Sequence, residues 1–507
     1  MKHVGLNVAA DPLFTMSYTG VRGGMVICVA DDPAMHSSQN EQDSRHYAIA
    51  AKVPMLEPAD SSEAYSFAKA AFDLSEQFDT PVMIRTCTRI AHCQSIVDIG
   101  EREGRDLIPY EKEPQKYIMM PGYAKKKHPV VEKRTKALTK FAENCGFNSI
   151  EYSNNNDIGI VTSGTCYQYV KEVFGNSVSV YKLGLINPMP VKSLIDFASR
   201  VKRLIVVEEL DPIIESHLRN IGLNPEGKSL FSNIGEFSQT DIKTILLNKT
   251  EENVTADTII PNRPPVMCPG CPHRGIYYVL AKLKLTVLGD IGCYTLGATP
   301  PLNVLDSTLC MGASVSGIHG FNKARGSESE NKTVCVIGDS TFMHSGMTGL
   351  VNIAYNASNS VVIILDNSIT GMTGHQQNPT TGYNIKGDPA AKVNLEKLCN
   401  SLGISRVRVV DPYNLKECEA AVKEELSIKE PSVIISRRPC MLLKYVKAKP
   451  ALIVDGDKCR SCKSCMRLGC PALSFKDGKA VIDATQCVGC GVCKQLCNFD
   501  AIKECEC

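Results

Sequence analysis

This sequence of 507 residues lacks three things, and each absence narrows what the protein can be. No apolar run approaches the ~20 residues of a membrane-spanning helix, and the first residues do not have the pattern of a signal peptide. Net charge is almost absent, because 56 Lys and Arg residues are balanced by 54 Asp and Glu residues. A polyanionic partner is therefore not implied. Tryptophan is also missing. We expect a soluble cytoplasmic protein that binds neither membranes nor nucleic acid.

Cysteine, by contrast, is abundant, and ten of the 23 cysteines fall in the last 57 residues. A disulfide scaffold is not expected in a long chain without a secretion signal. Ligation of a metal or a cluster is the better interpretation. Many thiols together with the absence of tryptophan also favour an anaerobic source.

Two runs of four cysteines make residues 450–507 the strongest signal in the sequence. Each run places three thiolates on one tight loop, and in two-cluster ferredoxins the fourth Cys of each run serves the other cluster. The predicted ligands are Cys459, Cys462, Cys465 and Cys497 for one [4Fe–4S] cluster, and Cys487, Cys490, Cys493 and Cys470 for the second. Zinc would not need two runs of four in this arrangement.

Residues 333–376 are predicted to form a strand (Val334–Ile337), a tight turn (Gly338–Ser340), a helix (Gly346–Tyr355) and a second buried strand (Val361–Leu365). Asp339 and Asn367 follow these two strands, and open α/β sheets bind their ligands at such carboxyl ends. Their side chains, with the main-chain oxygen of Ile369, suit a hard cation such as Mg²⁺. The stretch resembles the thiamine-diphosphate signature, with Ser340 in the third position, where glycine is usual. The alternative is an ordinary strand-turn-helix in which Asp339 only caps the helix.

Four further cysteines lie in the same region of the chain. Cys268 and Cys271 form a Cys-x2-Cys turn, which zinc, an iron–sulfur cluster and a redox dithiol all use. Cys293 and Cys440 each end a strand-like run, and strand ends converge in this kind of sheet. We therefore predict that the four thiolates hold a third [4Fe–4S] cluster. The alternative is that some of them are buried small apolar residues.

Alternating strand and helix patterns elsewhere predict a multidomain α/β protein with parallel sheets. We place α/β units at residues 1–110, 156–250 and 262–448, a linker and helix at 111–155, and the cysteine-rich domain at 450–507. A polar linker is expected at residues 250–258. The basic run at residues 125–128 is interpreted as solvated surface.

A thiamine-diphosphate domain followed by a two-cluster segment resembles the 2-oxoacid:ferredoxin oxidoreductases. The sequences CPGCPHR and GDIGCYTLG, the Gly-Asp-Ser turn and the expanded first cysteine run resemble the α subunits of the indolepyruvate:ferredoxin branch over essentially the whole chain. The resemblance implies a partial pyrimidine-binding domain at 1–110, a transketolase C-terminal-like domain at 156–250, a diphosphate-binding domain at 262–448 and a ferredoxin-like domain at 450–507.

The resemblance also implies site residues. His36, Ser37 and Ser38, in the polar loop after the first strand, become candidates for contacting the 2-oxoacid; a solvated loop is the alternative. His273 corresponds to a family residue near the cofactor, although it could also be structural. The small residues Gly312, Ala313 and Ser314 are expected to approach thiamine diphosphate closely.

Members of this family normally begin with about 90 further residues. Those residues include the first half of the pyrimidine-binding domain and the glutamate that promotes cofactor activation. We expect that glutamate to lie outside this chain.

The implied reaction is the oxidative decarboxylation of aryl pyruvates with coenzyme A to aryl-acetyl-CoA and CO₂, with electrons passing through iron–sulfur clusters to ferredoxin. A smaller β subunit would complete an α2β2 assembly. Two alternatives stay open: a non-redox 2-oxoacid decarboxylase, and an electron-transfer subunit or inactive remnant.

Overall fold

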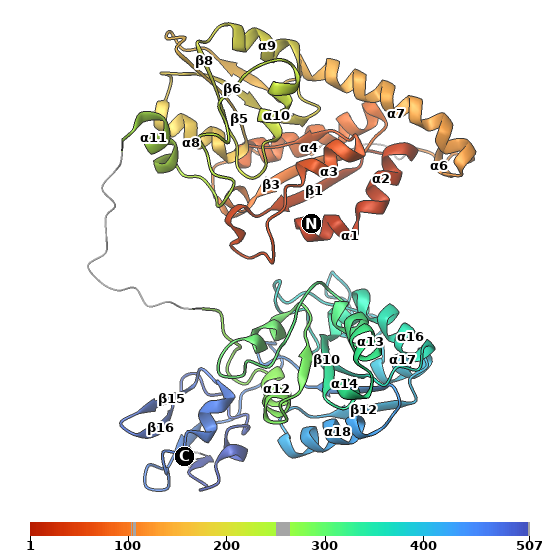
Figure 1. Ribbon diagram of the computed structural model, residues 1–507, viewed down its shortest axis with the longest axis vertical. Helices are drawn as coiled ribbons and strands as arrows, with labels where there is room; N and C mark the ends of the chain where they lie inside the picture. Colours follow the sequence, from red (N-terminus) through yellow and green to blue (C-terminus); the bar gives the residue numbers. More distant parts are fainter. Residues whose placement is uncertain (103, 105–107, 250–263, 505–507) are drawn as a thin grey trace. The chain divides into compact units, whose positions relative to one another are not determined.

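The computed structural model describes residues 1–102, 104, 108–249 and 264–504. The chain divides into two compact units, Met1–Asp257 and Thr258–Cys507, each of which is described by itself (Figure 1). The linker expected at residues 250–258 lies outside the described residues. Within the described ranges, no helix is long and apolar enough to cross a membrane.

The first unit contains two mixed four-stranded sheets. In one, β1, β3 and β2 run parallel and β7 pairs antiparallel with β2. In the other, β6, β5 and β8 run parallel and β4 pairs antiparallel with β6. The strands are β1 (Val26–Asp31), β2 (Met55–Leu56), β3 (Val82–Cys87), β4 (Ser149–Glu151), β5 (Ile158–Ser163), β6 (Ser179–Leu183), β7 (Leu185–Asn187) and β8 (Arg203–Val207).

Helices connect these strands. The long helix α7 carries the chain from the first sheet toward the second, and Pro121 at its first position suits a helix start. The helices are α1 (His3–Val8), α2 (Ala10–Thr19), α3 (Arg45–Ala51), α4 (Ser61–Phe78), α5 (Thr88–His92), α6 (Pro114–Tyr117), α7 (Pro121–Ala142), α8 (Gly164–Phe174), α9 (Lys192–Ser199), α10 (Ile213–Asn220) and α11 (Gln239–Leu247).

Residues 180–188 have the pattern of one continuous strand, but the structure divides them between the two sheets. β6 ends at Leu183 and β7 begins at Leu185. A Cβ atom on the intervening Gly184 would lie 2.2 Å from the main-chain oxygen of Phe147, so only glycine fits this approach. The apolar pattern alone cannot reveal the division, because both halves are buried.

The second unit is built on a five-stranded parallel sheet with the order β12-β13-β11-β10-β9. The central strands β10 and β11 are buried along their whole length, as expected when helices cover both faces. One face packs against α12 and α18, and the other against α13, α16 and α17. The strands are β9 (Thr286–Leu288), β10 (Thr333–Gly338), β11 (Val361–Asp366), β12 (Arg406–Val410) and β13 (Ser432–Arg437). The helices are α12 (His273–Lys282), α13 (Ala313–Arg325), α16 (Met347–Tyr355), α17 (Leu395–Ser401) and α18 (Leu415–Ser427).

The helix after β10 begins earlier than its sequence pattern predicts. Instead of a turn at residues 338–340 and a helix from Gly346, the chain enters α15 (Asp339–Thr341), passes through the π-helical segment η3 (Phe342–Gly346) and continues as α16. Insertions of this π type are frequent at functional sites.

The C-terminal segment packs as a small cysteine-rich lobe within the second unit. Its two antiparallel strand pairs are β14 (Leu452–Val454) with β17 (Ile502–Glu504), and β15 (Leu473–Lys476) with β16 (Lys479–Ile482). The buried residues of this lobe, including Leu468, Val492 and Ile502, are continuous with the core under α12 and α18.

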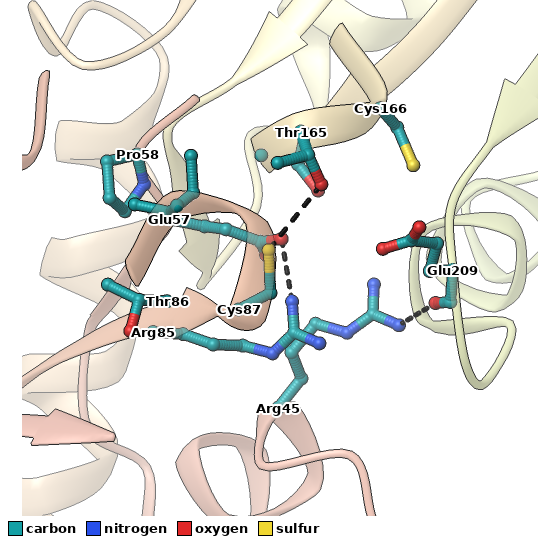
Figure 2. A pocket seen from close by; sticks show the side chains of 12 residues that line it. Arg45, Glu57, Pro58, Arg85, Thr86, Cys87, Thr165, Cys166 and Glu209 are labelled. Carbon is teal, nitrogen blue, oxygen red and sulfur yellow. Dashed lines mark hydrogen bonds and ion pairs between the residues drawn. The ribbon is translucent and has the colours of Figure 1, made fainter. Parts of the chain in front are cut away.

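A buried network of charged side chains connects the two sheets of the first unit, and Figure 2 shows its two arginines, Arg45 and Arg85, together with Glu57. Arg85 on β3 donates to Asp31 and to Glu57, both at 2.6 Å. Arg45 on α3 donates to Asp43 and, at 2.7 Å, to Glu208, which follows β8 of the other sheet. Such pairs offset the cost of burying each charge only while both partners are present.

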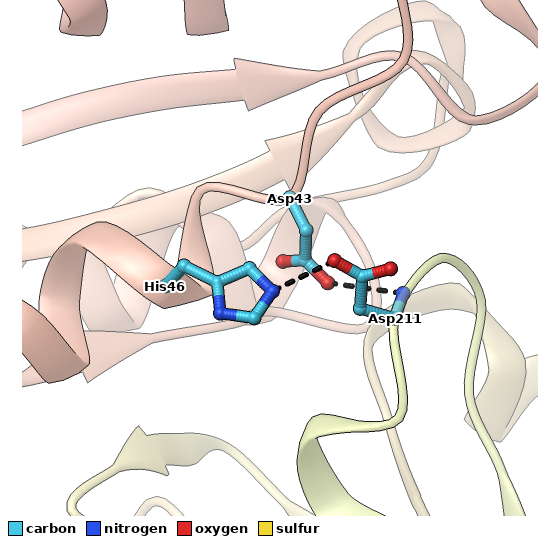
Figure 3. A group of neighbouring side chains, drawn as sticks. All are labelled: Asp43, His46 and Asp211. Atoms are coloured by element: carbon cyan, nitrogen blue, oxygen red, sulfur yellow. Dashed lines mark hydrogen bonds and ion pairs between the residues drawn. The ribbon is translucent and has the colours of Figure 1, made fainter.

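Asp43 also belongs to a carboxylate–histidine group with His46 and Asp211 (Figure 3). The nearest atoms of His46 and Asp211 are 2.7 Å apart. The two oxygens of Asp43, however, already accept hydrogen bonds from the Arg45 guanidinium. A metal ion at Asp43 would have to lie beside this positive charge. We therefore assign the group to the ion-pair network and not to a metal centre.

The network predicts a large effect for Arg85→Met. Two carboxylates would remain buried without their cation, so the unit Met1–Asp257 should lose about 3–5 kcal/mol of stability. Urea unfolding followed by circular dichroism measures this loss. The matched variant Arg200→Met removes a guanidinium whose ion pair with Asp196 is half exposed, and it should leave the unfolding midpoint nearly unchanged. Equal midpoints for both variants would show that the buried network does not stabilise the unit.

Candidate functional site

The candidate site lies at the carboxyl edge of the parallel sheet in the second unit. β10 ends at Gly338 and β11 at Asp366, and these neighbouring strands are paired in register. Asp339 and Asn367 therefore leave the sheet side by side, and both side chains are buried. This is the edge at which open parallel sheets bind ligands.

The side chains of Asp339 and Asn367 and the main-chain oxygen of Ile369 converge there, and we call them the oxygen site. The amide group of Asn367 lies 3.2 Å from Asp339 Oδ1 and 2.7 Å from the main-chain oxygen of Ile369, and with its nitrogen toward both atoms it donates a hydrogen bond to each. A bound cation would instead turn the amide oxygen toward the ion, so that three oxygen atoms could serve as its ligands. Adjacent ligands of octahedral Mg²⁺ lie about 2.9 Å apart, so the three residues fit that ion.

Asp339 is held in place by two residues that sequence reasoning missed. Its second oxygen, Oδ2, accepts from the Thr380 hydroxyl at 2.9 Å and from the Asn378 amide at 3.2 Å. Burial, together with the charge of Asp366, raises the pKa of Asp339 to about 7. Neither Thr380 nor Asn378 stands in a recognisable motif, because both lie in an irregular segment about forty residues further along the chain.

Ser340 and His273 flank the oxygen site. The hydroxyl of Ser340 accepts a hydrogen bond from Thr370 at 2.8 Å. His273, the first residue of α12, lies 3.5 Å from the Asn367 amide, and its ring packs edge-on against Tyr294. Burial lowers the pKa of His273 to about 4, so its ring is neutral near pH 7.

A pocket of about 110 Å³ opens beside the oxygen site. Predicted residues in its lining are His273, Cys293, Asp339, Ser340, Asn367 and Ile369. Gly312, Ala313 and Ser314 are outside that lining, whereas Met311 is part of it. The main-chain N–H groups of Gly312 and Ser314 donate to the buried carboxylate of Asp290. A Cβ atom at Gly312 would lie 2.7 Å from the main-chain oxygen of Ser345. Local packing thus accounts for this glycine, and its approach to a cofactor stays a prediction.

Cys268, Cys271, Cys293 and Cys440 come together next to this pocket, and we call them the central thiol group. Burial raises the pKa of Cys293, and Cys440 and Cys268 raise it further. Burial likewise raises the pKa of Cys271 to about 12, with added contributions from Cys268 and Cys440. The N–H group of Cys440 donates to the main-chain oxygen of Asn367 at 2.9 Å. The central thiol group is thereby connected directly to the oxygen site.

Two of these cysteines occupy different local structure from that predicted. Cys293 does not end a strand: β9 stops at Leu288, and Cys293 opens the 3₁₀ helix η2 (Cys293–Ala298). Cys440 lies three residues beyond the end of β13 at Arg437. Both cysteines still lie at the carboxyl edge of the sheet, because they stand in the segments that follow β9 and β13.

For the C-terminal cysteines we call Cys459, Cys462, Cys465 and Cys497 the first C-terminal group, and Cys487, Cys490, Cys493 and Cys470 the second, as the spacing predicts. Burial raises the pKa of Cys465, and Cys462, Cys497 and Cys459 raise it further. Burial also raises the pKa of Cys493 to about 12, with added contributions from Cys490, Cys470, Cys487 and Cys465. That the last cysteine of each run serves the cluster of the other run stays a prediction.

The loop that carries Cys268 and Cys271 packs against the loop of Cys487. Gly270, between Cys268 and Cys271, has a φ of +64°, and a Cβ atom there would lie 2.2 Å from the side chain of Val488, which follows Cys487. The Tyr413 hydroxyl donates to the main-chain oxygen of Gly270. These contacts bring two cysteine loops, more than 200 residues apart in sequence, against each other.

The predicted substrate-contacting loop belongs to the other compact unit. His36 lies 3.1 Å from a carboxylate oxygen of Glu236. The N–H group of Ser37 and the hydroxyl group of Ser38 both donate to Asp32. Ser37 and Ser38 thus shape the loop at the carboxyl end of β1, a role that the sequence does not reveal.

Comparison with known proteins adds to this geometry. Residues 290–436 match the family model of the thiamine pyrophosphate enzyme C-terminal TPP binding domain. The chain is 38% identical to indolepyruvate oxidoreductase subunit IorA of Archaeoglobus fulgidus over 533 residues, which cover 99% of this chain and 85% of that protein. The same subunits of Methanothermobacter thermautotrophicus and Pyrococcus abyssi are each 38% identical, with the same coverage. With a thiamine-diphosphate domain and this identity over nearly its whole length, the chain belongs to the IorA family of oxidoreductase catalytic subunits.

Proposed function

We propose that this chain is the catalytic α subunit of a 2-oxoacid:ferredoxin oxidoreductase of the indolepyruvate type. It would convert aryl pyruvates, with coenzyme A, into aryl-acetyl-CoA and CO₂. The observation that carries the proposal is the convergence of Asp339, Asn367 and Ile369 at the carboxyl edge of the sheet, in a pocket that Cys293 of the central thiol group also lines. Such a site would hold a metal–diphosphate group next to a centre that accepts electrons.

In cofactor binding, the residues of this chain would hold and orient the ligand. Asp339, Asn367 and Ile369 would hold Mg²⁺, and Thr380 fixes the orientation of the Asp339 carboxylate. A diphosphate would bind near Ser340 at the start of α15, where the helix dipole favours a negative charge. Thiamine diphosphate, when bound, supplies an electron sink for the loss of CO₂ from a 2-oxoacid.

Electrons from the substrate would leave through cysteine-bound clusters. The two C-terminal groups of four thiols fit two [4Fe–4S] clusters, and the central thiol group fits a third. The contact of the Gly270 loop with Val488 supports a route from the pocket to the second C-terminal group and on to ferredoxin. We propose that a smaller β subunit completes an α2β2 enzyme, since the relatives are named as subunits.

The proposal is tested anaerobically with the chain and its companion subunit. Indolepyruvate and phenylpyruvate should each reduce methyl viologen in a reaction that depends on coenzyme A, whereas 2-oxoglutarate should be a poor substrate. Release of CO₂ without dye reduction would overturn the proposal in favour of a non-redox decarboxylase. Ferredoxin reoxidation without any 2-oxoacid turnover would instead indicate an electron-transfer subunit.

The hydrogen bond from Thr380 to Asp339 predicts the effect of Thr380→Val. This change keeps the shape of the side chain but removes the donor, so Mg²⁺-dependent binding of thiamine diphosphate should weaken about tenfold. Calorimetric titration measures the affinity. Thr348→Val removes an exposed hydroxyl that donates only to a main-chain oxygen, and it should have no effect. Unchanged affinity in Thr380→Val would mean that Asp339 does not depend on this support.

Three clusters would give about twelve iron atoms in each chain. Cys293→Ser should lower this content by about four atoms, because one ligand of the central thiol group is lost. Iron analysis and electron paramagnetic resonance of the reduced protein measure the change. Cys28→Ser alters an exposed cysteine outside all three groups and should keep the full content. About eight atoms in the unaltered chain, or no loss in Cys293→Ser, would rule out the central cluster.

A further inference from the structure

A buried positive charge in the second unit lacks a carboxylate partner. Arg274, the second residue of α12, is only 4% exposed. Among the described residues, all hydrogen bonds of its guanidinium go to main-chain oxygens. In the first unit, Arg45 and Arg85 pair directly with carboxylates, and Arg134 has the charge of Asp79 nearby. A guanidinium keeps its charge when it is buried, so Arg274 needs a negative charge beside it.

The Arg274 guanidinium joins two segments of the second unit. Its Nη2 atom donates to the main-chain oxygens of Met267, at 2.5 Å, and Cys268, at 3.3 Å, in the loop before α12. Its Nη1 atom donates to those of Leu468, at 3.0 Å, and Gly469, at 2.6 Å, in the cysteine-rich lobe. One side chain therefore connects two loops that lie 194 residues apart in sequence.

Both loops carry cysteines, so the buried charge lies between two groups of thiols. Cys268 belongs to the central thiol group, and Cys470 of the second C-terminal group directly follows the contact in the lobe. Burial raises the pKa of Cys271 and of Cys490, one from each group, and the charge of Arg274 opposes the rise at both. One cation is thus shared by the central thiol group and the second C-terminal group.

Two further features of Arg274 favour an anion beside it. Its Nε–H group is buried and has no hydrogen-bond partner among the described residues, which is unfavourable. Arg274 also stands in the first turn of α12, where the helix dipole disfavours a positive charge. Iron–sulfur clusters held by thiolates would supply the negative charge, and their sulfur atoms accept hydrogen bonds. The residues present therefore fit clusters at both thiol groups.

The first C-terminal group has a different source of positive charge. Hydrogen bonds from main-chain N–H groups lower the pKa of Cys459, and the exposed Lys479 lowers it further. Hydrogen bonds likewise lower the pKa of Cys462, with a contribution from the exposed Arg467. Charges at the surface are screened by salt, whereas a buried charge is screened much less. Arg274 should therefore act on two thiol groups and not on this one.

We propose that Arg274 is the counter-charge shared by the clusters of the central thiol group and the second C-terminal group, and that it makes one-electron reduction of both more favourable. The inference rests on the proposed function, which supplies the clusters and, from the 2-oxoacid, their electrons. A cluster held by four thiolates is anionic, and each electron that it gains adds a negative charge. A fixed positive charge in a water-excluded site stabilises this reduced form. No bond forms or breaks at Arg274, and no proton moves.

The test compares Arg274→Gln with Arg274→Lys in the holoenzyme. Titration with dithionite, followed by electron paramagnetic resonance, measures the midpoint potential of each cluster. In Arg274→Gln, two of the three transitions should move to lower potential, with reduction about tenfold less favourable, or about 59 mV for one electron. In Arg274→Lys the charge is kept although the guanidinium is lost, so both potentials should stay close to those of the unaltered protein.

Arg325→Gln serves as the matched control, because Arg325 forms an exposed ion pair with Glu328 in the same unit. It should shift no transition. Iron analysis of every variant shows whether the clusters are still present. If Arg274→Gln loses clusters that Arg274→Lys keeps, the charge is required and the inference is supported. Equal loss in both variants would show that the hydrogen bonds of the guanidinium matter and not its charge, which would overturn the inference.

Two results at full iron content would also overturn it. Unchanged potentials in Arg274→Gln would mean that the charge does not act on the clusters, and the proposed function would be unaffected. An equal shift of all three transitions would mean that the charge is not specific to two thiol groups. Absence of iron from the unaltered holoenzyme would instead overturn the proposed function, and the inference with it.

Discussion

The negative charge of Asp339 is the constraint on which the candidate site depends. The side chain is placed where two fully buried strands end, and its bonded partners Thr380 and Asn378 carry no charge. A carboxylate in such surroundings is costly unless a proton or a cation neutralises it. The side-chain amide of Asn367 and the main-chain oxygen of Ile369 lie beside it, and the amide can donate to both oxygens or turn its own oxygen toward a cation. The N–H group of Cys440 donates to the main-chain oxygen of Asn367, so one cysteine of the central thiol group lies next to this point.

The first unit meets the same constraint in a different way. Asp31, Asp43 and Glu57 are also buried, but Arg85 and Arg45 supply the positive charge from within the chain. The group of Asp43, His46 and Asp211 has ligand-like geometry, yet it needs no ion because Arg45 is already there. A cluster of acidic side chains therefore indicates a metal only where no guanidinium or ammonium group reaches it. Among the described residues, no guanidinium or ammonium group contacts Asp339, whereas the Arg45 guanidinium contacts Asp43.

Local sequence pattern was sufficient to predict β10, β11 and the placement of Asp339 and Asn367, because buried parallel strands are short apolar runs and their ends define one edge. Spacing also predicts how the C-terminal thiols exchange partners, and this stays a prediction. It could not predict Thr380, Asn378 or the pairing of Arg89 with Glu236, since these contacts join segments that only the folded chain brings together. Nor could periodicity show that β6 and β7, on either side of Gly184, belong to different sheets, because both strands are buried and apolar.

The contacts of Gly270 would set an order among the three thiol groups if each of them held a cluster. The central thiol group adjoins the oxygen site through Cys440 and adjoins the second C-terminal group through Gly270 and Val488. Cys465 of the first group is among the thiols that raise the pKa of Cys493 in that second group. Because no side chain fits at Gly270, the two loops can pack directly on each other. If all three groups hold clusters, electrons entering beside Asn367 would pass through the central group before either C-terminal one, and the group of Cys465 would be the one that delivers them.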